Sequence, residues 1–335
     1  MSPRRIAAVF VARNREFFRD RHTLAWTILL PVAIVFGFAF AFSGSAPERY
    51  TVGVLGDPQV AAERLAIQGV EFTGVADRET ALDKVRRHRL DLLLDLDARR
   101  YWVSDASPKG YLLERVLWGV AEGGPQTFAR ESVPGRTIRY VDWLVPGLLA
   151  MNMMFTALFG VGFVIVRYRK NGVLKRLKAT PLTPAEFLVA QLGSRLLIIV
   201  AITAAIFAGS HAILDFPLYG SVAALLVVLV LGGICLIALG LIIAARTDSE
   251  ELAGGLLNMM SWPMMFLSGV WFSTEGLHPW LQTLARALPL THVIEAARAV
   301  MIDGAGLAAI APNLAVLVAM SAAFLALGAF MFRWE

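Results

Sequence analysis

The chain is poor in cysteine, in charge and in histidine. Its 335 residues include one cysteine, Cys235, which lies inside an apolar run and excludes an intramolecular disulfide. Charged residues make up 17% of the chain, whereas soluble domains contain about 25%. Apolar residues make up 57%, and this excess excludes an ordinary soluble protein.

Residue patterns typical of catalysis, metal binding and nucleotide binding are also lacking. The sequence has no Gly-x-x-x-x-Gly-Lys-(Ser/Thr) phosphate loop, so any ATP hydrolysis must come from a partner. The five histidines are scattered, and no serine or cysteine has a base within a plausible spacing. We therefore predict no catalytic residue, no metal site and no cofactor bound by this chain itself.

Apolar residues gather in runs of about 20, which is the length needed to cross roughly 30 Å of hydrocarbon. We predict spans over residues 23–43, 143–166, 196–214, 218–245, 252–272 and 310–332. Residues 1–22 have the pattern of an amphipathic helix at a membrane surface. The predicted fold class is a membrane all-α bundle of six transmembrane helices with an inserted small extracytoplasmic α/β domain.

The loops between the spans predict the orientation of the chain. Arginine is abundant in residues 1–22, and the loop after the second span is strongly basic, so both are expected in the cytoplasm. An even number of spans then places both termini there and residues 44–142 outside. Topology accounts for much of the net charge of +5, and we predict no nucleic-acid partner.

The insert at residues 44–142 has the composition of a soluble domain, with 14 basic and 15 acidic residues. Short β-rich runs alternate in it with helical patterns, which predicts an α/β domain. The expected strands are residues 50–55, 70–75, 90–95 and 100–104, and the expected helices are residues 57–66, 77–88 and 108–120.

A basic loop from Arg167 to Pro184 joins the second and third spans. Gly172 is expected to break the preceding helix, and residues 172–178 then form a short amphipathic helix with lysine and arginine on one face. The helix is suited to receive a cytosolic partner. The alternative is a basic loop that lies on anionic lipid.

This loop resembles the corresponding stretch of ABC-2 type exporter permeases. The matching residues are Gly172, Leu174, Leu177, Ala179, Thr180, Pro181 and Leu182. Residues 288–298 are similar to the outer segment that precedes the last span in that family. One span, an outer domain and five further spans (residues 143–335) form the layout of the subgroup with a large extracytoplasmic domain.

The resemblance implies a plasma-membrane permease, in bacteria an inner-membrane one, that forms a twelve-span dimer with a second copy or a paralogue. A separate cytosolic ABC ATPase would bind ATP and Mg²⁺ and dock on a coupling helix, here residues 172–178, and on residues 1–22. The implied coupling interface contains Gly172, Val173, Leu174, Arg176, Leu177 and Pro181.

Several further residues carry expectations. Asn258, Met259 and Trp262 in the fifth span are candidates for the translocation path, although a hydrogen bond between helices explains Asn258 better than a path role does. Arg195 is expected to extend to the inner membrane interface, and the alternative is a buried charge with a functional role. Residues 277–302 are expected to form outer re-entrant or interfacial helices, in which Glu295 and Arg298 stabilise one helix.

The function that we predict is export of an amphipathic substrate, such as a drug, a lipid or an antibiotic, because the spans are almost uncharged. Membrane lipids are further expected partners. Two alternatives stay open. One is a membrane sensor or scaffold with an extracytoplasmic ligand-binding domain, and the other is an ion-coupled secondary transporter, which usually needs buried acids or histidines.

Overall fold

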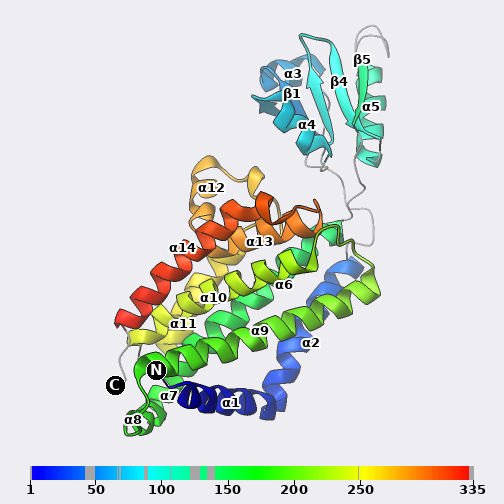
Figure 1. Cartoon of the computed structure of the whole chain (residues 1–335). Helices are drawn as coiled ribbons and strands as arrows, with labels where there is room; N and C mark the ends of the chain where they lie inside the picture. The colour runs from blue at the N-terminus through cyan, green and yellow to red at the C-terminus, as the bar shows by residue number, and fades with distance from the viewer. Residues whose placement is uncertain are drawn as a thin grey trace. The chain divides into compact units, whose positions relative to one another are not determined.

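The computed structural model describes residues 2–41, 50–65, 67, 69–86, 90–105, 107–120, 129–133, 140–247 and 249–331. The chain divides into two compact units (Figure 1). Residues Phe42–Tyr140 form an α/β unit, and the segments on either side of it together form a helical unit. Each unit is described by itself.

The helical unit begins with α1 (Pro3–Arg19) and α2 (Arg21–Ala41). The chain re-enters it after the α/β unit and continues as a series of apolar helices joined by short turns. These are α6 (Tyr140–Leu158), a π-helical turn (Phe159–Phe163), α7 (Val164–Lys170), α8 (Val173–Lys178), α9 (Pro184–Leu214), α10 (Val222–Arg246), α11 (Glu250–Leu267), α12 (Pro279–Arg286), α13 (Pro289–Met301) and α14 (Leu307–Met331).

Four helical stretches among the described residues are long and apolar enough to cross a membrane, namely Tyr140–Lys170, Pro184–Leu214, Val222–Ala245 and Leu307–Met331. They correspond to the second, third, fourth and sixth predicted spans. The helix of the first predicted span, α2, contains a shorter apolar stretch, Thr27–Phe38. The chain is thus a multi-pass helical membrane protein, and six spans remain a prediction.

Two helices differ in extent from the prediction. The helix of the third predicted span begins before residue 196, because α9 runs without a break from Pro184 to Leu214, over 31 residues. Its length of about 46 Å exceeds the hydrocarbon thickness of roughly 30 Å. The helix of the fifth predicted span, α11, ends earlier than predicted, at Leu267, and Gly269 then turns the chain with a φ of 82°.

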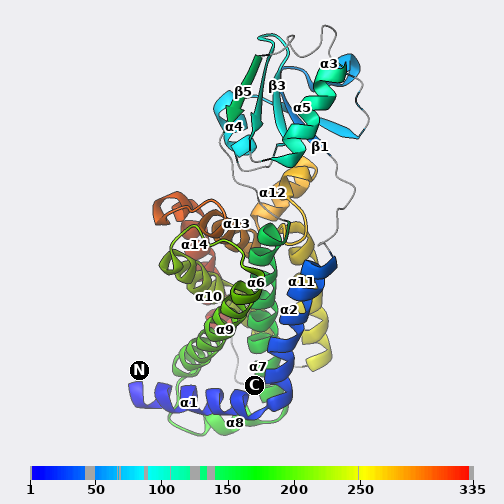
Figure 2. The ribbon, with the colours of Figure 1, turned by 90° about the vertical axis from the view of Figure 1, so that its right-hand side faces the viewer.

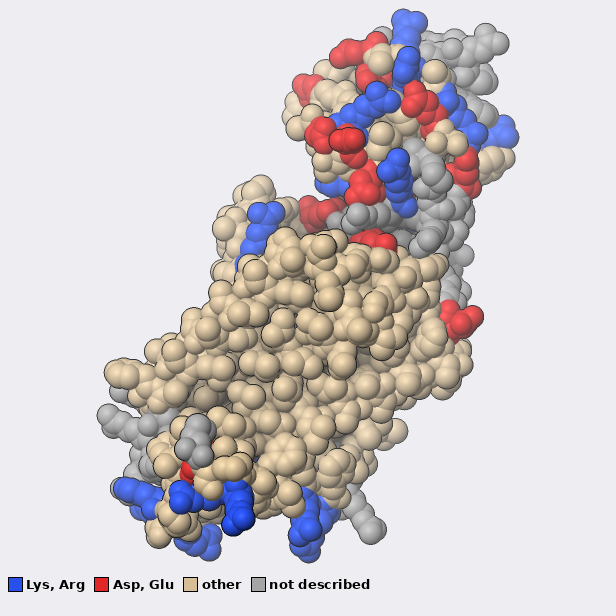
Figure 3. All heavy atoms as spheres, in the orientation of Figure 1, with Lys and Arg blue, Asp and Glu red and all other residues tan. Residues whose placement is uncertain are grey.

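The helical unit has two distinct ends. Helices α1 and α8 lie at one end, and α12 and α13 lie at the other (Figures 1 and 2). On the face shown in Figure 3, its flank is uncharged, whereas lysine and arginine gather at the end that carries α8. This arrangement fits a body that sits in hydrocarbon with a basic end in water.

The α/β unit is built on a five-stranded sheet with the order β2-β1-β3-β4-β5. All neighbouring strands are parallel except β3 and β4, which are antiparallel. The strands are β1 (Tyr50–Leu55), β2 (Val70–Val75), β3 (Leu92–Asp95), β4 (Arg100–Ser104) and β5 (Ala129–Val133). Helices α3 (Pro58–Leu65), α4 (Arg78–Arg86) and α5 (Pro108–Val120) connect or follow them.

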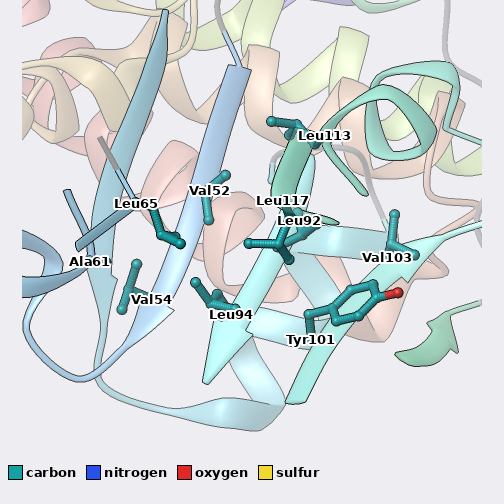
Figure 4. Close-up of a cluster of buried hydrophobic side chains, with 10 residues drawn as sticks. All are labelled: Val52, Val54, Ala61, Leu65, Leu92, Leu94, Tyr101, Val103, Leu113 and Leu117. Atoms are coloured by element: carbon teal, nitrogen blue, oxygen red, sulfur yellow. The ribbon is translucent and has the colours of Figure 1, made fainter. Parts of the chain in front are cut away.

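Alternate residues of the strands pack on opposite faces of this sheet. One face packs against α3 and α5 through a buried cluster that includes Val52, Val54, Leu92, Leu94 and Tyr101 (Figure 4). The alternate strand residues Leu93 and Trp102 point to the other face of the sheet. There they pack against Ala81 and Val85 of α4. Both faces are therefore covered, as a largely parallel sheet requires.

The edge strand β5 was not predicted. Its sequence, Ala-Arg-Glu-Ser-Val, lacks the apolar alternation that identifies a strand. Polar contacts secure it instead, since Glu131 accepts hydrogen bonds from Trp102 Nε1 and, at 3.2 Å, from Arg100 Nη1. These partners lie on β4 and become neighbours only through the tertiary fold.

The start of α4 yields a pH-dependent prediction. Hydrogen bonds from the Thr80 side chain and backbone lower the pKa of Asp77 below its ordinary value. The cap therefore stabilises α4 above the ordinary aspartate pKa and is lost as the pH falls through the lowered value. We expect α4 amides in the wild type to lose protection at acid pH, measured as hydrogen exchange normalised to the intrinsic rate. Asp77→Asn caps without titrating, so an equal loss in this variant would contradict the prediction.

Candidate functional site

The short helix α8 lies at the basic end of the helical unit and follows a tight turn. Asn171 ends α7, and Gly172 then takes a left-handed backbone conformation with a φ of 67°, which favours glycine. The Gly172 carbonyl accepts the first helical hydrogen bond, from Arg176 N at 3.1 Å. The chain thus reverses away from α7 and begins a new helix one residue later.

The residues predicted to form the coupling interface differ in exposure. Leu174 is fully buried, at 0% exposed, and so contacts the protein's own interior. Gly172, Val173 and Leu177 are half-buried, and Arg176 and Pro181 are exposed. In this conformation Leu174 therefore supports the surface from beneath, and the other residues are accessible at that surface.

The loop after α8 is fastened to the first residues of the chain. Thr183 and Glu186 form a capping box at the start of α9, in which the Glu186 carboxylate accepts from Thr183 N at 3.0 Å. The same buried carboxylate accepts from Ser2 N at 2.6 Å and lies 3.6 Å from Arg5 Nη1. Arg5 also donates to the carbonyl oxygen of Pro181. The start of α1 and the α8–α9 loop are therefore one connected surface.

A second set of contacts holds the far part of α1. Arg13 pairs with Glu16 at 2.6 Å, and both side chains hydrogen-bond to the Tyr168 hydroxyl of α7. The Arg13 guanidinium also lies 4.8 Å from the centre of the Tyr168 ring. Helix α1 is thus fixed at both ends to the segments that flank α8.

Several basic residues of the predicted loop are occupied inside the chain. Arg169 donates to the carbonyl oxygens of Ala244, Ala245 and Thr247, at 3.0, 3.1 and 2.6 Å, and so caps the end of α10. Glu250 lies 4.0 Å from Arg167 and 3.7 Å from Lys170. The remaining cationic side chains on α8 are Lys175, Arg176 and Lys178, which are exposed.

The contacts of the Glu186 carboxylate with Thr183, Ser2 and Arg5, called here the Glu186 clamp, can be tested on their own. We expect Glu186→Ala to remove the capping box and release the start of α1, because one carboxylate serves both contacts. Limited proteolysis near the N-terminus should become several-fold faster. Glu186→Gln keeps one acceptor oxygen, so its rate of cleavage should lie between those of the wild type and the alanine variant. Cleavage of the alanine variant at the wild-type rate would show that other contacts suffice to hold α1.

An open cavity of about 540 Å³ is formed on the helical unit by α2, α6, the π-helical turn and α11, together with Phe17 of α1 and Arg195 of α9. Of the three residues predicted for the translocation path, Asn258 lines this cavity. Met259 and Trp262 are 74% and 52% exposed and are not among its lining residues. The Asn258 side chain donates within its own helix, to Gly254 O at 2.9 Å.

The expectation for Arg195 was wrong. Its side chain does not extend into water but is 8% exposed and lines the cavity. Both Nε and Nη2 donate to the carbonyl oxygen of Gly160, at 3.0 and 2.5 Å. The sequence could not reveal this contact, because the carbonyl is presented by a π-helical turn 35 residues earlier in the chain.

The opposite end of the helical unit contains a second polar cluster, which is partly buried. Arg298 of α13 donates to Trp143 O at 3.1 Å and to Gly269 O at 2.7 Å. Its guanidinium also lies 3.6 Å from the centre of the Trp143 ring. Arg298 therefore joins α13 to α6 and to the turn after α11. Its predicted helix partner Glu295 is exposed.

Comparison with known proteins places the chain among permeases. The chain is 24% identical to the inner membrane transport permease YhhJ of Escherichia coli (strain K12) over 190 residues, which are 56% of this chain and 51% of that protein. It is 24% identical over 238 residues to the probable multidrug ABC transporter permease YbhR of the same organism, which covers 69% of this chain and 64% of that protein.

A third relative is the daunorubicin resistance ABC transporter permease protein DrrB1 of Streptomyces coeruleorubidus, with 26% identity over 178 residues, 51% of this chain and 60% of that protein. The chain spans between half and two thirds of the length of these relatives. The model of the family described as ABC-2 type transporter matches residues 94–302, more than half of the chain. A multi-pass helical unit, a basic end built on α8 and this match together show that the chain belongs to the ABC-2 type transporter family.

Proposed function

We propose that this chain is the permease subunit of an exporter that moves an amphipathic substrate out of the cytoplasm or the inner leaflet. Membership of the family implies an ABC ATPase partner, which would bind ATP and Mg²⁺. The α/β unit would lie outside the cell. Helices α2 and α11 would complete six spans, and a second permease copy or paralogue would complete the transporter.

The observation that carries the proposal is the connected surface at the basic end. It consists of α8, the loop to α9 and the start of α1, joined through Pro181, Glu186 and Arg5. Force applied to one part of this surface would reach the others without a flexible joint. The exposed residues Arg176 and Pro181 and the half-buried Gly172, Val173 and Leu177 would contact the ATPase.

Leu174 would hold this surface in place by packing against the interior of the helical unit. The ATPase would approach from the side on which Lys175, Arg176 and Lys178 are exposed, so we expect its contact face to be acidic. The two termini would lie in the cytoplasm with this end of the helical unit. The apolar flank in Figure 3 would face lipid and a second permease subunit.

The proposal is tested by co-purification from the native membrane in mild detergent. We expect an ABC ATPase to co-purify with the wild type and to be lost with the double variant Arg176→Glu/Leu177→Glu. This variant replaces one positive charge with a negative charge and adds a second negative charge, and it leaves buried Leu174 unchanged. Arg286→Glu, an exposed site on α12 at the other end of the helical unit, is the matched control and should retain the ATPase. Failure of the wild type to bring down any ATPase would overturn the exporter assignment.

A further inference from the structure

The cavity of the helical unit has an uneven chemical lining. Most of its wall is apolar, including the rings of Phe17, Phe155 and Phe159. A small number of polar side chains interrupts this wall, namely Thr27, Asn152, Thr156, Arg195 and Asn258. At about 540 Å³ the cavity has the size of a small-molecule site, and an apolar wall with a few polar groups is typical of such sites.

Arg195 is the charged residue in this wall. Its two hydrogen bonds both go to one neutral acceptor, the Gly160 carbonyl oxygen, and they use Nε and Nη2. The guanidinium also lies 5.6 Å from the centre of the Phe17 ring. Among the described residues no carboxylate forms an ion pair with Arg195. The groups that contact the guanidinium directly are thus neutral, and the nearby charges of Arg13 and Glu16 are paired with each other at 2.6 Å.

Burying a cation in this way is energetically unfavourable unless an anion completes the site. Guanidinium groups bind carboxylates, phosphates and sulfates through strong charge-assisted hydrogen bonds, and the donors on Nη1 are not used by Gly160. The neighbouring phenyl rings and the aliphatic side chains of Leu30, Ile34 and Val164 offer an apolar surface to the rest of a ligand. Together these features select a molecule with one acidic group and an apolar body.

We propose that this cavity binds an anionic amphiphile, with its acidic group against Arg195 and its apolar part against the phenylalanine rings. The proposal rests on the proposed function and names the substrate class within it. Neutral and cationic amphiphiles would bind more weakly, because neither satisfies the buried guanidinium. Arg195 is a ligand-binding residue in this assignment.

The π-helical turn positions this cation. Gly160 lies against Arg195, and a Cβ atom at this position would overlap the guanidinium, with Nη2 only 2.6 Å away. The wide turn at Phe159–Phe163 also directs the Gly160 carbonyl toward α9. Gly160→Ala is therefore a useful variant, since it retains the positive charge but displaces it from its present site.

Binding is measured with the protein in phosphatidylcholine nanodiscs. The probe is an alkyl sulfate that carries a dansyl group, and the matched neutral probe is the corresponding alcohol. Energy transfer from tryptophan to dansyl reports binding, and unlabelled alkyl sulfate must compete for it. We expect the wild type to bind the sulfate at least about tenfold more tightly than the alcohol, as one charge-assisted contact allows.

The variants separate charge from packing. We expect Arg195→Gln, Gly160→Ala and Asn258→Asp each to weaken sulfate binding about tenfold and to leave alcohol binding unchanged. Asn258→Asp is decisive if the first two fail to fold, because it adds a repulsive charge to the cavity and leaves Arg195 in place. Arg15→Gln, an exposed site on α1, is the control. Equal binding of the sulfate and the alcohol by wild type, or unchanged sulfate binding by Asn258→Asp, would overturn the proposal.

Two further arms identify the source of the ligand. Phosphatidylglycerol in the nanodisc should displace the sulfate if the ligand is a bilayer lipid, and should not displace it if the ligand is a soluble or exported amphiphile. Co-purification of the ATPase is scored on the same preparations. Loss of selectivity for the sulfate with the ATPase still bound would refute only the substrate class, whereas selective binding without any ATPase would refute the exporter function.

Discussion

Leu174→Glu is expected to destabilise the protein by at least about 4 kcal/mol, because it loses a buried leucine and places a carboxylate where water has no access. We expect both a lower Tm in detergent and loss of the ATPase, because α8 would no longer pack against the helical unit. Thermal aggregation followed by fluorescence-detected size exclusion measures the first effect, and co-purification measures the second.

Leu174→Met is the matched control for this substitution. It conserves volume and should cost less than about 1.5 kcal/mol, so the ATPase should stay bound. The comparison separates a supporting residue from a contact residue. A Leu174→Glu protein with the wild-type Tm that nevertheless lost its ATPase would show that Leu174 is itself part of the docking surface.

Arg298→Ala should have the second large effect, a loss of about 3 kcal/mol, because two carbonyl acceptors lose a charged donor and the Trp143 ring loses its cation. Since Arg298 joins three segments, the variant should also expose the turn around Gly269 to protease. The measurements are the Tm and the rate of cleavage at that turn.

Arg298→Lys provides the comparison, because a lysine keeps the charge but lacks the planar arrangement of donors that reaches both carbonyls. We expect it to recover less than half of the lost stability. Full recovery by lysine would mean that charge, rather than the two directed hydrogen bonds, holds this end of the helical unit.

Much of the architecture could be predicted from local patterns. Apolar runs located the helices of the membrane unit, and β-rich runs located four strands, including Tyr50–Leu55 and Val70–Val75 with the observed bounds. The strand β5 escaped prediction because side chains from other segments hold it in place. Patterns within a segment cannot report such contacts.

The candidate site shows the same limit more sharply. An amphipathic pattern identifies the apolar face of α8, but it does not reveal whether that face packs inward or meets a partner, and Leu174 packs inward. For Arg195, a position beside a long apolar run is typical of an arginine that extends to the interface. The π-helical turn that presents Gly160 leaves no recognisable signal in the sequence, so the sequence could not favour the buried alternative.

Helix α9, all of which the structure describes, links two features that have been considered separately. It starts at the Glu186 clamp, contains Arg195 about 14 Å further along its axis, and has neither an interior proline nor a π-helical turn. A helix without such interruptions moves as a rigid body, so a movement at one end is transmitted along its length. A tilt of α9 imposed at its Glu186 end would move the Arg195 guanidinium relative to the cavity, so docking of the proposed ATPase would act directly on the proposed ligand site.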